Sequence, residues 1–107
     1  MNTSNANARQ YVNQLIDFKG SHIFAETKEK QITNPLKNAV YQSNGITEKI
    51  YTVFSYGYHF PMYACIKNKW YGNSDKYSQS TSKHQNQTRP NGQINFVDTK
   101  TLQSLIA

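Results

Sequence analysis

The sequence predicts an α+β domain in which a small antiparallel sheet of three or four strands packs with helices on one face. Residues 49–73 alternate with a period of two and are rich in tyrosine, phenylalanine and β-branched residues, which favours strands. The flanking segments repeat apolar residues at helical spacing and begin at capping residues. A chain of 107 residues accommodates one domain with a small core, so we expect a single domain over residues 1–107.

The first predicted helix covers residues 7–19, after a polar stretch (residues 1–7) that we expect to be flexible. Gly20 stands where a left-handed C-terminal cap belongs. The apolar stripe of this helix consists of Ala8, Tyr11, Val12, Leu15 and Phe18.

Two weaker elements follow. His22 to Glu26 is a candidate short strand. Asn34-Pro35 pairs a capping residue with a proline at the first helical position, which predicts a short middle helix that ends at Ser43-Asn44-Gly45.

The predicted meander has strands over residues 49–56, 59–66 and 69–73. Pro61 has no N–H to donate to a sheet, so the second strand should have a free edge or a bulge near its start. A free edge there would also allow a homodimer. After the meander, Ser80 or Thr81 is expected to cap a helix over residues 82–88, and Asp98 a helix over residues 99–106.

Twelve lysines and arginines against six acidic residues give a net charge of +6, which favours a polyanionic partner such as nucleic acid, or an acidic protein. Lysines alternate with hydroxyl and amide side chains between residues 67 and 89, as in phosphate-binding surfaces. The candidate anion-binding residues are Lys67, Lys69, Lys76, Thr81, Ser82, Lys83, His84 and Arg89.

Aromatic residues are concentrated in the same half of the chain. Exposed rings beside lysines stack on bases or anchor a protein partner, whereas buried ones form the core of a domain poor in aliphatic residues. The candidates for stacking or partner anchoring are Tyr56, Tyr58, Trp70, Tyr71 and Tyr77.

Evidence for an enzyme is thin. His59 and His84 are the candidate catalytic residues, although no acidic residue lies at a sequence spacing from either that would indicate a catalytic pair. Asp17 followed by Glu26-Thr27-Lys28 matches the carboxylate and lysine pattern of many metal-dependent nucleases, a short pattern that often arises by chance.

No spacing of cysteine and histidine fits a zinc site, and the sequence predicts no metal or other cofactor. The single cysteine, Cys65, lies in an apolar run and is expected to be buried. Without a membrane-spanning run or a signal peptide, the expected location is the cytoplasm, with no membrane partner.

One resemblance adds context. The motifs are Ser55-Tyr56-Gly57-x-His59-Phe60-Pro61, Trp70-Tyr71-x-Asn73, Asp75-Lys76-Tyr77-Ser78 and Thr81-Ser82-Lys83-His84. Over residues 48–89 they resemble a small domain of unknown function found in bacteriophages, plasmids and other mobile elements. That resemblance implies an accessory protein acting in a bacterial cytoplasm. It points to Tyr56, His59, Tyr77, Thr81, Ser82, Lys83 and His84 as the site.

Three functions remain open at this point. The first is nucleic-acid binding through the basic face of residues 67–89, without catalysis. The second is a protein-interaction module that inhibits a host protein, for instance one of a defence system. The third is a small enzyme that uses His59 or His84.

Overall fold

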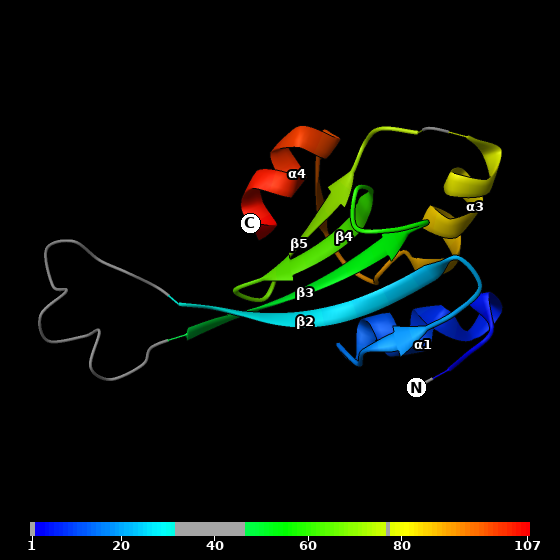
Figure 1. The fold of residues 1–107 in the computed structure, drawn as a ribbon, viewed down its shortest axis with the longest axis horizontal. Helices are drawn as coiled ribbons and strands as arrows, with labels where there is room; N and C mark the ends of the chain where they lie inside the picture. The colour runs from blue at the N-terminus through cyan, green and yellow to red at the C-terminus, as the bar shows by residue number, and fades with distance from the viewer. Residues whose placement is uncertain (1, 32–46, 77) are drawn as a thin grey trace, which may run out of the picture.

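The computed structural model describes residues 2–31, 47–76 and 78–107, which form a six-stranded sheet with helices on both faces (Figure 1). The strands are β1 (Phe18–Lys19), β2 (Ile23–Gln31), β3 (Thr47–Ser55), β4 (Pro61–Ile66), β5 (Lys69–Asn73) and β6 (Ile94–Val97). The helices are α1 (Ala8–Asn13), α3 (Gln79–Thr88) and α4 (Thr99–Ile106), and a 3₁₀ turn, η1 (Asn5–Asn7), precedes α1. The α+β class is confirmed, and the sheet is larger than predicted. The predicted middle helix and Tyr77 lie outside the described residues.

The predicted meander is present as β3, β4 and β5, which lie next to one another in the sheet. Lys67 and Asn68 both have positive φ angles, 52° and 63°, as the two central residues of a tight hairpin turn require. Strand β4 has a neighbour on each side, so of the two predicted alternatives near Pro61, a free edge or a bulge, the structure has the bulge. Pro61 stands opposite Phe54, where the register shifts after Val53, which is the bulge that its missing N–H allows.

The sheet is mixed rather than wholly antiparallel. Strand β6 runs parallel to β5, and α3 makes the crossover between them. Because β6 has only four residues and two of them, Asn95 and Phe96, are exposed, its alternation is too short to be read from the sequence. Helix α3 also starts earlier than predicted: Ser78 is the N-cap, and its Oγ accepts from the Thr81 N–H at 3.1 Å.

The N-terminal helix ends at Asn13, well before residue 19, because Leu15 takes a left-handed conformation (φ 56°) and the chain turns into β1. Phe18 remains in the core, now as a strand residue. Gly20 is not a left-handed cap. Its missing side chain makes room for Asn5, because a Cβ at Gly20 would lie only 2.6 Å from Asn5 Oδ1. The preceding stretch, described from residue 2, has defined contacts, and the Thr3 N–H donates to the Lys19 carbonyl at 3.0 Å.

The helices cover two faces of the sheet, not one. Helices α1 and α3 lie over the face that carries Tyr51, Val53 and Tyr63, where the main hydrophobic cluster forms. Helix α4 lies over β4 and β5 on the opposite face and buries Leu102 completely. The candidate site described below is on the α1 and α3 side.

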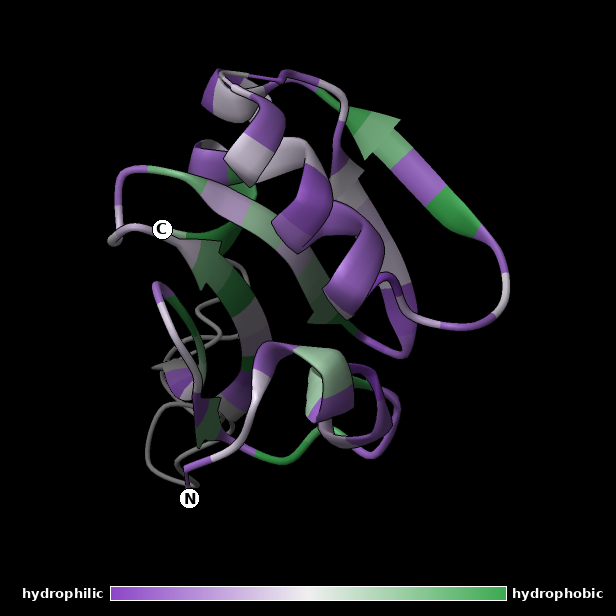
Figure 2. Ribbon diagram, turned by 90° about the vertical axis from the view of Figure 1, so that its right-hand side faces the viewer, coloured by the Kyte–Doolittle hydropathy of each residue, from purple (hydrophilic) through white to green (hydrophobic). Residues whose placement is uncertain are grey.

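Helix α3 is hydrophilic along most of its length (Figure 2), and the side chains that it buries are polar: Thr81, His84, Gln85 and Thr88. Hydrogen bonds therefore attach it to the sheet. The Gln85 amide donates to the carbonyls of Asn73 and Asp75, each at 3.1 Å, and the Tyr63 hydroxyl donates to the Gln85 carbonyl at 2.9 Å.

Asn73 connects this contact to α4. Its amide nitrogen donates to the Pro61 carbonyl at 2.8 Å and to Thr99 Oγ1 at 3.0 Å. Its side-chain oxygen accepts from the Asp75 N–H at 2.8 Å. Since Asn73 is 3% exposed, water cannot replace these bonds if they are lost.

We expect Asn73→Ala to lower the free energy of unfolding by about 1–3 kcal/mol, because buried partners are left unpaired. Asn95→Ala, on the exposed side of β6, is the matched control, with a change within about 0.5 kcal/mol. Urea denaturation measures both. Equal effects in the two variants would contradict a connecting role for Asn73.

Candidate functional site

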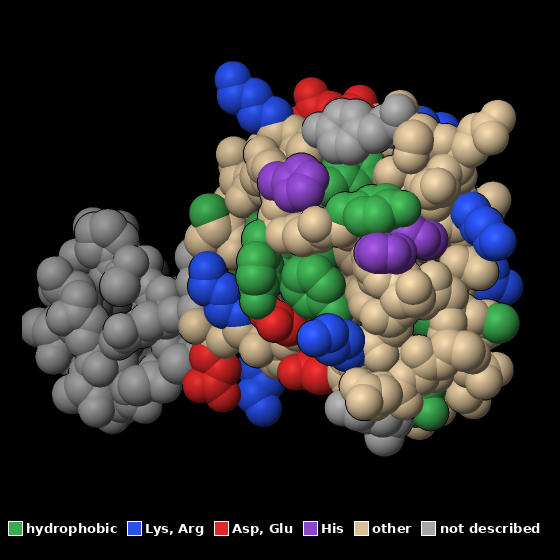
Figure 3. Space-filling model, turned by 45° about the vertical axis from the view of Figure 1, so that its right-hand side comes forward, with side chains coloured by type: hydrophobic (Ala, Val, Ile, Leu, Met, Phe, Trp, Pro, Cys, Tyr) green, Lys and Arg blue, Asp and Glu red, His purple; other side chains and the backbone are tan. Residues whose placement is uncertain are grey.

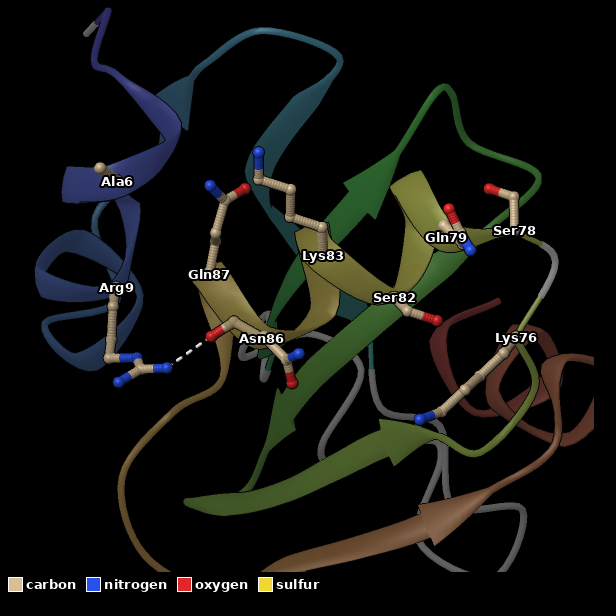
Figure 4. A pocket seen from close by; sticks show the side chains of 9 residues that line it. All are labelled: Ala6, Arg9, Lys76, Ser78, Gln79, Ser82, Lys83, Asn86 and Gln87. Carbon is tan, nitrogen blue, oxygen red and sulfur yellow. Dashed lines mark hydrogen bonds between the residues drawn. The ribbon is translucent and has the colours of Figure 1, made fainter.

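A hollow of about 790 Å³ lies along α3, between that helix and the N-terminal segment of η1 and α1 (Figure 4). Three cationic side chains line it: Arg9 from α1, Lys76 from the segment after β5, and Lys83 from α3. The other lining residues are Ala6, Ser78, Gln79, Ser82, Asn86 and Gln87. The lining thus combines positive charge with hydroxyl and amide groups and holds no carboxylate; we call it the cationic hollow.

The local structure explains this lining. With the helix capped at Ser78, residues 79, 82, 83 and 86 fall at i, i+3, i+4 and i+7 and share one face of α3. Arg9 is exposed, next to the buried Ala8, and its guanidinium donates to the Asn86 carbonyl. A guanidinium has five N–H groups, so this bond fixes Arg9 while leaving further donors for an anion.

None of the acidic residues lines the hollow, although Asp75 directly precedes Lys76 in the chain. Asp75 accepts from the Thr99 N–H and hydroxyl at 2.9 and 2.8 Å, and Asp98 caps α4 by accepting from the Thr101 N–H at 2.8 Å. Hydrogen bonding to the Thr101 side chain, and then to its backbone N–H, lowers the pKa of Asp98. The remaining carboxylates belong to Asp17, just before β1, and to Glu26, Glu29 and Glu48 on β2 and β3. The charge of the cationic hollow is therefore not neutralised from within its lining.

The structure brings together only part of the predicted anion-binding set. Lys76, Ser82 and Lys83 line the cationic hollow. Lys67 and Lys69 lie at the other end of β5 from Lys76, and this strand of five residues is itself about 15 Å long. The Arg89 guanidinium lies 5.5 Å from the centre of the Phe96 ring. Thr81 and His84 are buried, so neither side chain contributes to the hollow.

His84 instead belongs to a cluster of rings beside the hollow. Its Nδ1 lies 2.8 Å from Ser55 Oγ, and its ring centre lies 5.3 Å from that of Tyr56. Tyr56 stacks on His22 with ring centres 5.0 Å apart and an angle of 28° between the planes. Figure 3 shows histidine and hydrophobic side chains adjoining on this face of the molecule. We call His22, Tyr56 and His84 the ring cluster.

Backbone geometry presents two of these rings. His22 and Tyr56 both have a φ of 64°, in the left-handed region, and the Tyr56 N–H donates to the His22 carbonyl at 2.8 Å. That conformation disfavours side chains with a Cβ by roughly 1–2 kcal/mol per residue, so the surrounding contacts must hold it. The result is a fixed pair of rings, with Tyr56 50% exposed and His22 also exposed.

The other aromatic candidates lie elsewhere. Tyr58 is 64% exposed and packs against Phe24 and Phe54, and its hydroxyl donates to the Glu26 carboxylate at 2.8 Å, which raises the pKa of Tyr58. Trp70 is half-buried, edge-on to Tyr51. Tyr71 is half-buried on β5, and strand alternation places it on the face of α4. Tyr56, by contrast, is joined to α3 through its contact with the His84 ring.

The remaining candidates have separate surroundings. His59 is exposed, and its carbonyl accepts from Gln103. Cys65 is buried as predicted, and burial raises the pKa of its thiol. Asp17 and Glu26 line a common pocket, but Thr27 donates to the first and Tyr58 to the second. Within the described ranges, no group of three histidine, cysteine, aspartate or glutamate side chains could hold a metal ion.

Sequence reasoning missed Arg9 and His22. Arg9 lies on the polar side of its helix, and no local pattern indicates that this side faces α3, more than 60 residues later in the chain. His22 precedes a strand, and nothing in its neighbours announces a left-handed backbone.

Burial and the charges of His22 and Lys83 lower the pKa of His84, so the folded protein takes up its proton less readily than the unfolded chain does. Stability should therefore fall as the pH drops below about 6.5, the ordinary histidine pKa. We expect the unfolding free energy to decrease between about pH 7.5 and about pH 5.5, and to decrease less in His84→Gln. Urea denaturation at both pH values measures this, with His59→Gln as the control for loss of an exposed imidazole. The same pH dependence in all three proteins would contradict the assignment to His84.

Comparison with protein-family models, curated proteins and solved structures gives no match. Among the helices that the structure describes, none is long and apolar enough to cross a membrane.

Proposed function

We propose that the chain is a non-enzymatic accessory protein that binds nucleic acid through the cationic hollow. The setting that the resemblance to mobile-element proteins implies, a phage or plasmid in a bacterial host, is part of the same proposal. The observation that carries it is the lining of the hollow by Arg9, Lys76 and Lys83 with no carboxylate among them.

The chemistry of the lining matches a phosphate backbone. Arginine binds phosphate through two parallel N–H donors, and lysine acts as a mobile point charge. The hydroxyl and amide groups of Ser82 and Asn86 add donors of the kind that contact phosphate oxygens. Contacts to phosphate oxygens carry no sequence information, so binding through the hollow is expected to be largely independent of sequence.

The first test is the salt dependence of binding to a labelled oligonucleotide. Lys83→Ala and Arg9→Ala should each weaken binding and reduce the slope of log K against log salt by about 0.7–0.9, because one counterion fewer is released. Lys100→Ala, on the exposed side of α4, removes the same net charge outside the hollow and is the matched control. Fluorescence anisotropy over a salt series gives both quantities.

Two results would count against this function. Binding that does not respond to salt would exclude phosphate contacts as its main source. An equal loss in Lys83→Ala and Lys100→Ala would show that overall charge, and not the hollow, attracts the nucleic acid.

A second candidate function is favoured by a different surface. Phe24, Phe54 and Tyr58 form an aromatic cluster with ring centres 5.0–5.1 Å apart, and Tyr58 is largely exposed. A groove of about 360 Å³ beside it separates β2 and β3 from the end of α4. Exposed aromatic residues beside a groove are typical anchors at protein interfaces, which supports a module that inhibits a host protein.

Tyr58→Ala separates the two functions. If the partner is a protein, the wild-type chain should retain one host protein in stoichiometric amount, and Tyr58→Ala should weaken that complex at least tenfold, as loss of an interface hot spot does. Lys83→Ala should leave it unchanged within about twofold. Co-purification from bacterial lysate followed by calorimetry with the identified protein measures this, and nucleic acid as the sole retained species would contradict it.

A further inference from the structure

We infer that the ligand of the cationic hollow is a single-stranded nucleic acid, with one unpaired base stacked on the His22–Tyr56 ring pair while its backbone lies on the hollow. This inference rests on the proposed function and adds the class of nucleic acid and a site for a base. It identifies His22 as a binding residue.

The ring pair is a surface feature that folding alone does not require. The main hydrophobic cluster contains neither His22 nor Tyr56, and both side chains are exposed. Yet both residues hold left-handed backbone conformations, which residues other than glycine rarely adopt, and a direct backbone hydrogen bond of 2.8 Å ties them together. Two exposed, stacked rings thus stand on strained backbone, and strain of this kind is concentrated at functional sites.

The pair is supported from below. Tyr56 also contacts the buried His84, which is fixed by Ser55 Oγ at 2.8 Å, and Ser55 is 1% exposed. A ring held in this way loses little conformational entropy when a base stacks on it, so more of the stacking energy is available as affinity.

The pair is also next to the phosphate site. His84, under Tyr56, is followed in the chain by the α3 residues of the cationic hollow and preceded by Lys83, whose charge and that of His22 both act on the His84 ring. Figure 4 shows the Lys83 side chain extending away from α3 at the edge of the hollow. Lys83 and the ring pair are thus neighbours. A nucleotide that stacks its base on the rings needs such a cation nearby for its phosphate.

A preference for single-stranded over double-stranded nucleic acid follows from this arrangement. In a duplex the faces of the bases are covered by their neighbours, so an external ring pair finds no face to stack on. An unpaired base offers its face, whatever its identity. A surface that combines fixed rings with cations therefore selects single strands without selecting sequence.

The experiment compares a single strand of about 12 nucleotides with a duplex of the same length, by fluorescence anisotropy at low salt. Tyr56→Ala should weaken single-strand binding by about 5- to 150-fold, the measured range for loss of one stacked base. It should change duplex binding by less than about twofold and leave the salt slope intact, since no charge is removed. Tyr56→Phe keeps the ring and should bind as the wild type does, and His22→Gln should weaken single-strand binding alone.

A direct readout comes from Tyr56→Trp. Its added indole emission should be quenched by the single strand and not by the duplex, whereas a purely structural role for the ring would give no such difference.

Each result is decisive. Equal losses for single strand and duplex in Tyr56→Ala would overturn the inference and assign the ring to folding. If Tyr56→Ala bound the single strand as tightly as the wild type while Lys83→Ala bound it more weakly, the stacking role of the ring pair would be overturned. The proposed function would still stand. Failure of the wild-type chain to bind either nucleic acid at low salt would remove both.

Discussion

The attachment of α3 to the sheet by hydrogen bonds is the constraint on which the rest of this structure depends. A helix in a small domain usually buries an apolar stripe, and its place then follows from hydrophobic packing. The inner face of α3 has threonine, histidine and glutamine instead. Directional bonds replace nonspecific packing: Gln85 donates to the carbonyls of Asn73 and Asp75, and Tyr63 donates to the Gln85 carbonyl. They fix the rotation and position of the helix as well as its distance from the sheet.

Both candidate surfaces depend on that fixed position. The outer side of α3 supplies five lining residues to the cationic hollow, and the inner face supplies His84, which contacts Tyr56. A rotation of the helix about its axis would move both sets of residues together. Phosphate contacts and ring contacts are thus parts of one rigid element, and this is how a domain with a small core presents a precise surface.

Much of the fold could be predicted from local pattern. The meander was readable because Ile50, Tyr51, Val53 and Phe54 carry a strand period and Lys67-Asn68 is a turn sequence. The last helix was readable from its cap, Asp98. Strand β6 was not, because a four-residue edge strand gains its place from a parallel partner more than 20 residues earlier, and pairing of that kind leaves no periodic trace. The first helix was predicted too long because the spacing of Leu15 and Phe18 continues its stripe, although the backbone has already turned.

The candidate site divides in the same way. Lys76, Ser82 and Lys83 stand close together in the sequence and were found there, whereas Arg9 reaches them only through the fold. Thr81 and His84 belong to the same motif, but a helix turns by about 100° per residue, so adjacent residues point in different directions and these two face inward. Composition identifies a basic segment; only the helix geometry separates the charges that meet solvent from the polar groups that hold the helix.

The polar contact between α3 and the sheet has a thermodynamic consequence. The side chains that α3 itself would expose on release are polar, so the helix contributes little of its own to the heat-capacity change and to the response to denaturant. The strands beneath, with Val53, Met62 and Tyr63 fully or almost fully buried, behave in the opposite way. The domain therefore contains two units of different thermodynamic character. Amide hydrogen exchange would distinguish them, because we expect the α3 amides to open by a local route that the sheet does not share.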